Sequence, residues 1–253
     1  MSGYIAFTKK EFTENIRNYR SLIMLVLFIF FGVSSPLLAK FSPQLVAAFA
    51  INIDITFAEP TALDAWAQFY KNISTLGLSL TIILFSSCLS SEYAKGTLTI
   101  MLTKGLSRKA VIMSKFSAAA TITTISYWLS FGIAYGYTVH LWPDVELPHV
   151  VFAAFPVWVT VLLYLCILML GCVLFRQAFT SILFLLVATV VMSLLGMASQ
   201  FEAISPSFLV SKNVDLLSNT VTINQFAIPA ITSIIISALL LILSIVTFRK
   251  KQL

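Results

Sequence analysis

Charge is what this sequence lacks most. Only 10% of its 253 residues are Asp, Glu, Lys or Arg, whereas 59% are hydrophobic and the mean hydropathy is +0.96. Soluble domains carry roughly a quarter charged residues, so this composition excludes an ordinary soluble protein. The apolar runs are also far longer than the roughly ten alternating residues of a membrane-barrel strand. Because helices are the remaining way to satisfy backbone groups in lipid, the sequence predicts an all-α integral membrane protein.

The sequence also lacks the motifs of catalysis. The dipeptide Gly-Lys does not occur, which excludes a phosphate-binding loop of the G-x-x-x-x-G-K-[ST] type, and there is no H-E-x-x-H, G-x-S-x-G or paired Cys-x-x-Cys. The cysteines Cys88, Cys166 and Cys172 fall inside apolar runs, where small buried thiols are expected. His140 and His149 are expected at a membrane interface. We therefore predict a protein that is not an enzyme, with no catalytic, cofactor-binding or metal-binding residue.

No Asp, Glu, Lys or Arg lies in the interior of any predicted span. Proton- or ion-coupled carriers generally need such groups, or broken helices, near the middle of the membrane. Their absence disfavours a secondary transporter, which remains a weaker alternative. A translocator of this composition takes its energy from elsewhere, such as a partner ATPase. The 21 Phe residues suit a hydrophobic or amphipathic substrate better than a sugar or an ion.

Charge-free runs of about 20 residues mark the membrane spans. The sequence predicts six transmembrane helices, at about residues 21–40, 72–91, 116–141, 150–173, 178–199 and 226–248. Residues 1–20 mix apolar and charged side chains and predict a helix that lies on the membrane surface rather than a signal peptide. Residues 40–71 are expected to form a loop on the outer side, with Trp66, Phe69 and Tyr70 at the interface. An even number of spans returns both termini to the same side.

The distribution of positive residues predicts the orientation. Residues 1–20, 92–115, 174–178 and 248–253 together hold 13 Lys and Arg, against three (Lys40, Lys71 and Lys212) on the other side. Because positive loops are retained in the cytoplasm, both termini and the 92–115 loop are predicted to be cytoplasmic. The net charge of +6 then reflects topology and anionic lipid, and nucleic acid binding need not be invoked.

Two segments outside the spans carry apolar patterns. Leu98, Met101 and Leu102 repeat at i, i+3 and i+4, which predicts a short helix with one apolar side; by itself this region could be an ordinary basic cytoplasmic loop. On the outer side, residues 201–225 mix apolar and polar residues. Their pattern favours short helices that dip back into the membrane, with a plain surface loop as the alternative. The apolar positions proposed to face the outer opening are Phe201, Ile204, Phe208 and Leu209.

The order of residues in the inner loop resembles a known family. Glu92, then Gly96-Thr97, Ser107-Arg108 and finally Lys115 stand as in the loop between the second and third spans of ABC-2 type transporter permeases. Gly105-Leu106 replaces a proline that many relatives have before the Ser-Arg pair. Residues 9–22 are also similar to the elbow helix that opens these permeases, so the resemblance covers the whole chain in architecture.

This resemblance implies a function and a set of partners. Residues 92–107 would be a coupling helix that docks on an ATPase, an interaction assigned to Glu92, Gly96, Thr97, Leu98, Met101, Leu102 and Arg108. Residues 201–225 would be a re-entrant outer hairpin that gates the exit. Two permease chains, as a homodimer or a heterodimer, would pair with two ABC ATPase subunits that hold the ATP and Mg²⁺. The complex would export a drug, a lipid-like molecule or an antimicrobial peptide across a bacterial cell membrane; a non-transporting sensor or scaffold subunit is the alternative.

Overall fold

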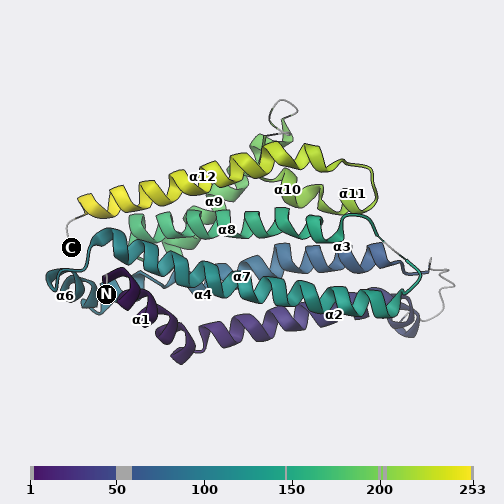
Figure 1. The fold of residues 1–253 in the computed structure, drawn as a ribbon, viewed down its shortest axis with the longest axis horizontal. Coiled ribbons are helices and arrows are strands. Elements are labelled where there is room, and N and C mark those ends of the chain that lie inside the picture. Colours follow the sequence, from purple (N-terminus) through teal and green to yellow (C-terminus); the bar gives the residue numbers. More distant parts are fainter. Residues whose placement is uncertain (1–2, 50–58, 146, 199–200, 202–203, 252–253) are drawn as a thin grey trace.

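The computed structural model describes residues 3–49, 59–145, 147–198, 201 and 204–251, and this part of the chain is helical without strands (Figure 1). The helices are α1 (Gly3–Arg17), α2 (Arg20–Phe49), α3 (Ala62–Asn72), α4 (Leu78–Ser86), α5 (Ser90–Ala94), α6 (Thr97–Thr103), α7 (Arg108–Leu141), α8 (Val150–Phe175), α9 (Ala178–Met197), α10 (Phe208–Ser211), α11 (Asn213–Leu217) and α12 (Ile223–Lys250). A π-helical turn, η1 (Ile73–Gly77), joins α3 to α4.

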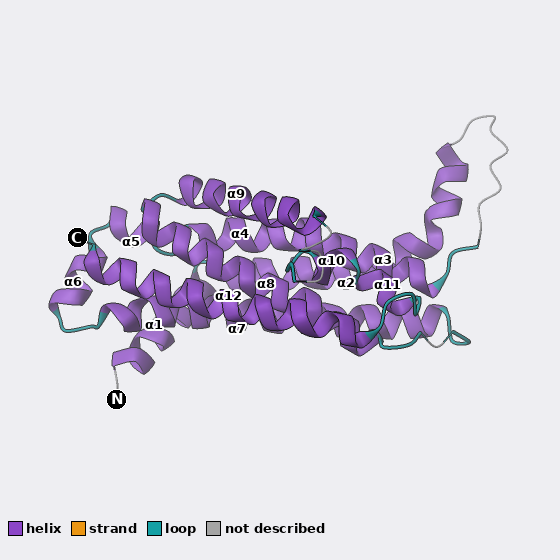
Figure 2. Ribbon diagram, turned by 90° about the horizontal axis from the view of Figure 1, so that it is seen from above, coloured by secondary structure: helices purple, strands orange, loops and turns teal. Residues whose placement is uncertain are grey.

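The long helices form an elongated bundle. Helices α2, α7, α8 and α12 run along its long axis, and both ends of the chain lie with α1 and α6 at one end, which we call the terminal end (Figure 1). The opposite end, where α3 and α8 begin, is called the far end. In the orthogonal view α9 lies along α4 on the outside of the bundle (Figure 2). The predicted cytoplasmic segments are therefore gathered at one end.

Five segments of the described chain are long and apolar enough to cross a membrane. They are Arg20–Gln44, Ala62–Ala94, Val150–Phe175, Ala178–Met197 and Ile223–Lys250. The predicted third span, residues 116–141, lies within the 34-residue helix α7, which is not among the five. Helix α7 is free of Asp, Glu, Lys and Arg beyond Lys115, but its many Ser, Thr and Tyr residues lower its hydropathy. The structure thus supports a multi-span helical protein, with six spans as a prediction.

The described part of the expected outer loop at residues 40–71 is largely helical instead; residues 50–58 lie outside it. Helix α2 extends to Phe49, and α3 begins at Ala62. Thr61 caps α3: its hydroxyl accepts from the Asp64 amide, and the Asp64 carboxylate accepts from the Thr61 amide at 2.9 Å. This reciprocal capping box starts the helix ten residues before the predicted span, a signal that hydropathy alone does not carry.

The aromatic residues of α3 were expected at the membrane interface, but they lie in the core. Trp66, Phe69 and Tyr70 are buried, and the Trp66 and Phe131 ring centroids are 5.3 Å apart. Helix α3 packs mainly against α2 and also contacts α7, so these rings face the interior of the bundle. The rings therefore connect α3 to α7, the helix that contains the third predicted span.

Helices α2 and α7 approach closely at Gly32. A Cβ atom at position 32 would lie 2.6 Å from the Ser130 carbonyl oxygen, and the Ser130 hydroxyl donates to the Phe28 carbonyl at 2.6 Å. Small residues allow helix backbones to approach in this way in membranes. This contact fixes the position of α7, whose first turns carry part of the candidate site.

Candidate functional site

The segment that leads from α4 to α7 is shaped by two glycines. We expected one coupling helix over residues 92–107; the structure instead has α5 and α6, separated at Gly96, whose φ is +65°. Gly105, with φ +88°, ends the region after α6. Nothing lies within 4 Å of a Cβ atom built at either position, so these glycines are required by the left-handed backbone and not by crowding. Ser107 then caps α7 by accepting a hydrogen bond from the Ala110 amide.

Glu92 lies at the centre of a buried ion cluster that joins three helices. Its Oε1 accepts from the Lys10 ammonium of α1 at 2.8 Å, and its Oε2 lies 3.1 Å from the Lys115 ammonium of α7. The second contact is an ion pair outside hydrogen-bond geometry. Glu11 completes the cluster by contacting Lys10 at 3.1 Å and Lys115 at 3.0 Å. Glu92 was assigned to ATPase coupling, but its carboxylate is held by the chain's own lysines.

Burial makes this cluster energetically significant. The side chains of Glu92, Glu11 and Lys115 are 5%, 6% and 2% exposed, whereas Lys10 is 37% exposed. Removing one partner of a buried pair leaves an uncompensated charge and costs about 3–5 kcal/mol. The carboxylates of Glu11, Glu14 and Glu92 lie within 4.8 Å of one another, as in a cation site. The ammonium groups of Lys10 and Lys115 between them already contact all three carboxylates, so the arrangement does not call for a metal ion.

The pKa values of Lys10 and Glu14, at the edge of the cluster, reflect the balance between burial and ion pairing. Partial burial alone would lower the pKa of Lys10, but its hydrogen bonds to Glu14 and Glu92, with the charges of Glu11 and Glu92, raise that pKa well above its usual value. Partial burial alone would raise the pKa of Glu14, but the hydrogen bond and charge of Lys10 outweigh this effect and lower it. Both residues are therefore charged at neutral pH.

Arg108 connects the start of α7 to the end of α12. Its guanidinium donates to the carbonyl oxygens of Phe248, Arg249 and Lys251 at 2.8, 2.9 and 2.6 Å. These are carbonyls that a helix C-terminus leaves without intrahelical partners. A cation there is also favoured by the helix dipole. Arg108, assigned to ATPase coupling, is thus directed at its own chain.

The residues of α6 divide between an inner and an outer side. Leu98 is 1% exposed and packs in the core, Met101 and Leu102 are half-buried, and Ile100 is 56% exposed. Thr99, Thr103 and Lys104 are exposed around Ile100. The apolar repeat was expected to face a partner; the structure turns its best-buried member, Leu98, inward. Ile100, which lies outside that repeat, was missed as a surface residue.

At the far end, the proposed outer gate is formed in part by two short helices. Helices α10 and α11 pack against α8, and α10 also contacts α12. Leu209 is fully buried, and the Phe208 and Phe226 ring centroids are 5.2 Å apart. Phe201 and Ile204 are 50% and 49% exposed; residues 202–203 lie outside the described part of the chain. The four gate residues therefore separate into an anchored pair and an exposed pair.

A groove between η1, α4 and α9 was not predicted from the sequence. It has a volume of about 490 Å³ and is lined by apolar side chains together with hydroxyls. The hydroxyl-bearing residues are Ser74, Thr75, Ser79, Tyr164, Thr189 and Ser193. The Ser74 Oγ is buried and has no hydrogen-bond partner in the described structure. The sequence signal that could have indicated this groove is the spacing of hydroxyl residues by four, at Thr75 and Ser79 in the second predicted span and at Thr189 and Ser193 in the fifth.

Comparisons with known proteins agree with this architecture. The chain matches the ABC-2 family transporter protein family over residues 5–253. It is also similar to an uncharacterized transmembrane protein, YxlG of Bacillus subtilis (strain 168), with 21% identity over 147 residues. That alignment covers 57% of this chain and 57% of the relative, less than two thirds of the relative's length. Since the family match spans nearly the whole sequence, the chain belongs to the ABC-2 family of transporter membrane proteins.

Proposed function

We propose that this chain is the permease subunit of an ATP-driven exporter and that α6 docks on the ATPase subunit. ABC-2 permeases generally pair with an ABC ATPase, and two copies of each chain would form the complex, with ATP and Mg²⁺ bound by the ATPase. The observation that carries the proposal is the position of α6: it is held at the terminal end between two left-handed glycines, with Ile100 exposed. The terminal end would be cytoplasmic, as the positive residues predict.

The docking surface would be the exposed side of α6. Ile100 would fill an apolar pocket of the ATPase, with Met101 and Leu102 at its border. Lys95, Lys104 and Lys109 are exposed beside it, so an acidic rim on the ATPase would complement this surface. Interface energy concentrates in a few central residues, whereas rim charges contribute little to affinity. Leu98 and Arg108 would support α6 from within the permease.

The ion cluster would transmit movement of α6 into the bundle. Through Glu92, the helix preceding α6 is attached to both α1 and α7. Helix α1 is further held along α7, because the Thr8 hydroxyl donates to the Ser114 hydroxyl at 2.9 Å. A displacement of α6 by the ATPase would therefore move α1 and α7 together rather than deform a loop.

The hydroxyl-lined groove would be the path of an amphipathic substrate. It opens between η1, α4 and α9, and most of the surface of α9 is exposed in the single chain. Its apolar walls suit a hydrocarbon part, and the hydroxyls suit a polar head group. π-Helical turns are often found at functional sites, and η1 supplies Ser74 and Thr75. The α10–α11 hairpin would close the path at the far end.

The test is co-purification with an ABC ATPase, followed by measurement of ATP hydrolysis and export. Ile100→Asp should weaken ATPase binding by about tenfold or more, because it places a charge in an apolar contact. Lys104→Ala, at the rim, should weaken binding by less than about threefold. Both changes are at exposed positions, so thermal stability should stay the same. Full binding by Ile100→Asp would contradict the docking proposal.

A sensor or scaffold subunit would keep the docking surface and lack export. That alternative would be favoured if the chain bound the ATPase normally but none of the candidate substrates stimulated ATP hydrolysis.

A further inference from the structure

The hydroxyls of the hydroxyl-lined groove are already used as hydrogen-bond donors. The Thr75 hydroxyl donates to the Lys71 carbonyl at 2.7 Å, and the Ser79 hydroxyl donates to the Thr75 carbonyl at 2.6 Å. On the other side of the groove, the Thr189 hydroxyl donates to the Leu186 carbonyl at 2.9 Å. Because a hydroxyl has one hydrogen and two lone pairs, these three side chains can only accept a hydrogen bond from a ligand.

Few donors face the groove in return. Its lining residues lie within η1, α4, α8 and α9, so their backbone N–H groups are used within the helices. None of these described residues is charged or carries an amide side chain. Ser193 and Tyr164 supply the remaining accessible hydroxyls, while the Ser74 Oγ is buried. The groove can therefore accept more hydrogen bonds than it can donate.

This balance disfavours the charged head groups of membrane lipids. Ionised phosphate and carboxylate groups bring only acceptors, and a quaternary ammonium brings no hydrogen to donate. A primary ammonium has hydrogens, but it would place a full charge in the groove without a carboxylate partner, which is costly. An uncharged hydroxyl or amide meets the lone pairs with its hydrogens and avoids that cost.

The rest of the groove fits a hydrocarbon chain. Leucines, Ile82 and Val190 supply its apolar wall. Its volume of about 490 Å³ is within the range of pockets that hold drug-sized molecules. Thr75 comes from η1 and Thr189 from α9, so acceptors stand on both helical segments that border the apolar wall. A ligand can therefore place its chain and its polar group in the groove together.

We propose that the hydroxyl-lined groove binds an uncharged amphiphile whose polar group donates hydrogen bonds, as an alcohol, a sugar or an amide does. Its hydrogens meet Thr75, Ser79 and Thr189, and its hydrocarbon part lies against the leucines, Ile82 and Val190. The inference rests on the proposed role of the groove as the substrate path, and it specifies the chemical class of that substrate.

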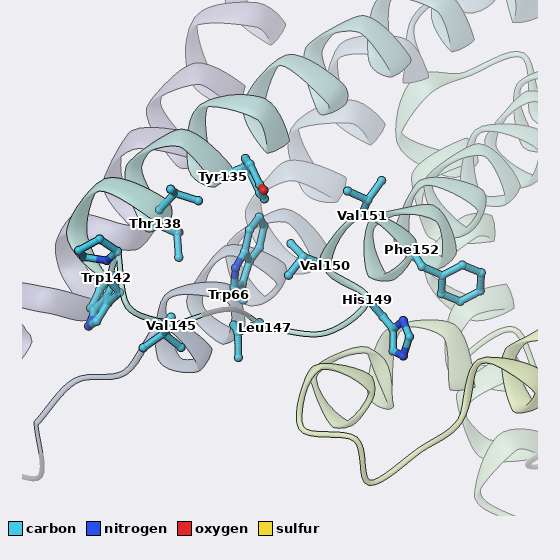
Figure 3. A pocket seen from close by; sticks show the side chains of 13 residues that line it. Trp66, Tyr135, Thr138, Trp142, Val145, Leu147, His149, Val150, Val151 and Phe152 are labelled. Carbon is cyan, nitrogen blue, oxygen red and sulfur yellow. The ribbon is translucent and has the colours of Figure 1, made fainter.

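A second cavity, at the far end, has to be separated from this site in a binding measurement. Its volume is about 470 Å³, and it lies between the start of α3, the end of α7 and the start of α8 (Figure 3). Rings and valines make up most of its described lining, in which Thr138 is the one Ser or Thr. Removing the Thr138 hydroxyl therefore tests binding in this cavity without changing the groove.

The test is equilibrium binding to the purified full chain in nanodiscs without any ATPase. Three probes share a decyl chain: 1-O-decylglycerol has hydroxyl donors, its dimethyl ether has none, and decylammonium has N–H donors and a positive charge. Each affinity is expressed relative to the probe concentration in the lipid, measured with empty nanodiscs. 1-O-Decylglycerol should bind saturably, about tenfold or more tighter than the dimethyl ether and about fivefold or more tighter than decylammonium.

Two substitutions keep the side-chain shape and remove one acceptor each. Thr75→Val and Thr189→Val should each weaken binding of 1-O-decylglycerol by about three- to tenfold. Neither should change binding of the dimethyl ether by more than about twofold, because that probe has no hydrogen to donate. The matched controls are Thr138→Val and Thr180→Val; Thr180 lies on α9 outside the groove and, like Thr189, donates to a carbonyl three residues earlier. Both should change the affinity by less than about twofold.

Equal affinity for 1-O-decylglycerol and its dimethyl ether would show that only hydrocarbon is recognised, and tighter binding of decylammonium would show a preference for cations; either result would overturn the proposal. So would binding that Thr138→Val alone weakens, or the absence of saturable binding, as expected if a second copy of the chain covered the groove. Selective binding would support the ligand class even if ATPase docking and export failed. Unselective binding would overturn it even if both succeeded.

Discussion

Replacing Lys115 with methionine tests the ion cluster most directly. Methionine keeps most of the side-chain volume and removes the ammonium that contacts Glu11 at 3.0 Å and Glu92 at 3.1 Å. Lys10 remains as the cation beside three carboxylates, and it is the more exposed of the two lysines. Glu11 and Glu92 are nearly inaccessible to water, so solvent cannot replace the lost partner.

The expected loss of stability follows from breaking a buried ion pair, about 3–5 kcal/mol. For a chain of this size, one kcal/mol shifts the Tm by roughly 2–4 °C, so Lys115→Met should lower it by about 6–20 °C. Glu92→Gln in the same chain removes one of the carboxylates left without its partner. The double variant should therefore be more stable than the sum of the two single changes indicates, by about 1–3 kcal/mol.

The assay is thermal unfolding of the purified permease in one lipid nanodisc preparation. Lys109→Met is the matched control, because it removes an exposed ammonium from the first turn of the same helix; it should shift the Tm by less than about 2 °C. If Lys115→Met unfolded within 2 °C of the wild type, or if the Lys115 and Glu92 changes were simply additive, the cluster would not hold these helices together.

Three further predictions concern other parts of the structure. The folded-state pKa of Glu14 is lowered from its ordinary value of 4.5, so its contribution to stability is present above that pH and is lost as the pH falls below it. Between pH 7 and pH 3, Glu14→Gln should therefore lose less stability than the wild type, as measured by unfolding. Arg108→Ala leaves the Phe248 carbonyl and its neighbours without a donor, so hydrogen exchange at the end of α12 should rise by about tenfold while α2 is unaffected; unchanged exchange would remove Arg108 from this role. Thr189→Val keeps the shape of the hydroxyl-lined groove, so it should raise the KM for export by about fivefold and leave ATPase binding at the wild-type level; an unchanged KM would argue against that path.

The sequence is most informative about the position of the later helices. The predicted spans at 150–173, 178–199 and 226–248 agree with α8, α9 and α12 within about three residues, because charged or turn residues bound each run. The helical segment that contains the second predicted span begins ten residues before it. Hydropathy did not indicate this extension, because Asp64 and Lys71 interrupt the apolar run of α3 while their side chains lie on its exposed side. Hydropathy averages the two sides of such a helix.

The partners of the site residues could not be read from the sequence. Glu92 meets Lys10 and Lys115, and Lys10 lies 82 residues earlier in the chain, a pairing that only the packing of α1 against α7 brings about. The i, i+3, i+4 pattern around Leu98 correctly indicated an apolar side for α6. It could not indicate that the core of the same chain, rather than a second protein, covers it.

The contact between Gly32 and Ser130 restricts how this protein can move. Sliding α2 along α7 by one helical turn, about 5.4 Å, would bring Phe28 or Pro36 to the place where only a hydrogen atom fits against the Ser130 carbonyl. A piston-like movement of these two helices is therefore blocked. Tilting about the Gly32 contact is not, because the small residue serves as a pivot. A force applied to α1 and α7 at the terminal end would therefore tilt α7 about this contact and move its far end in the opposite direction.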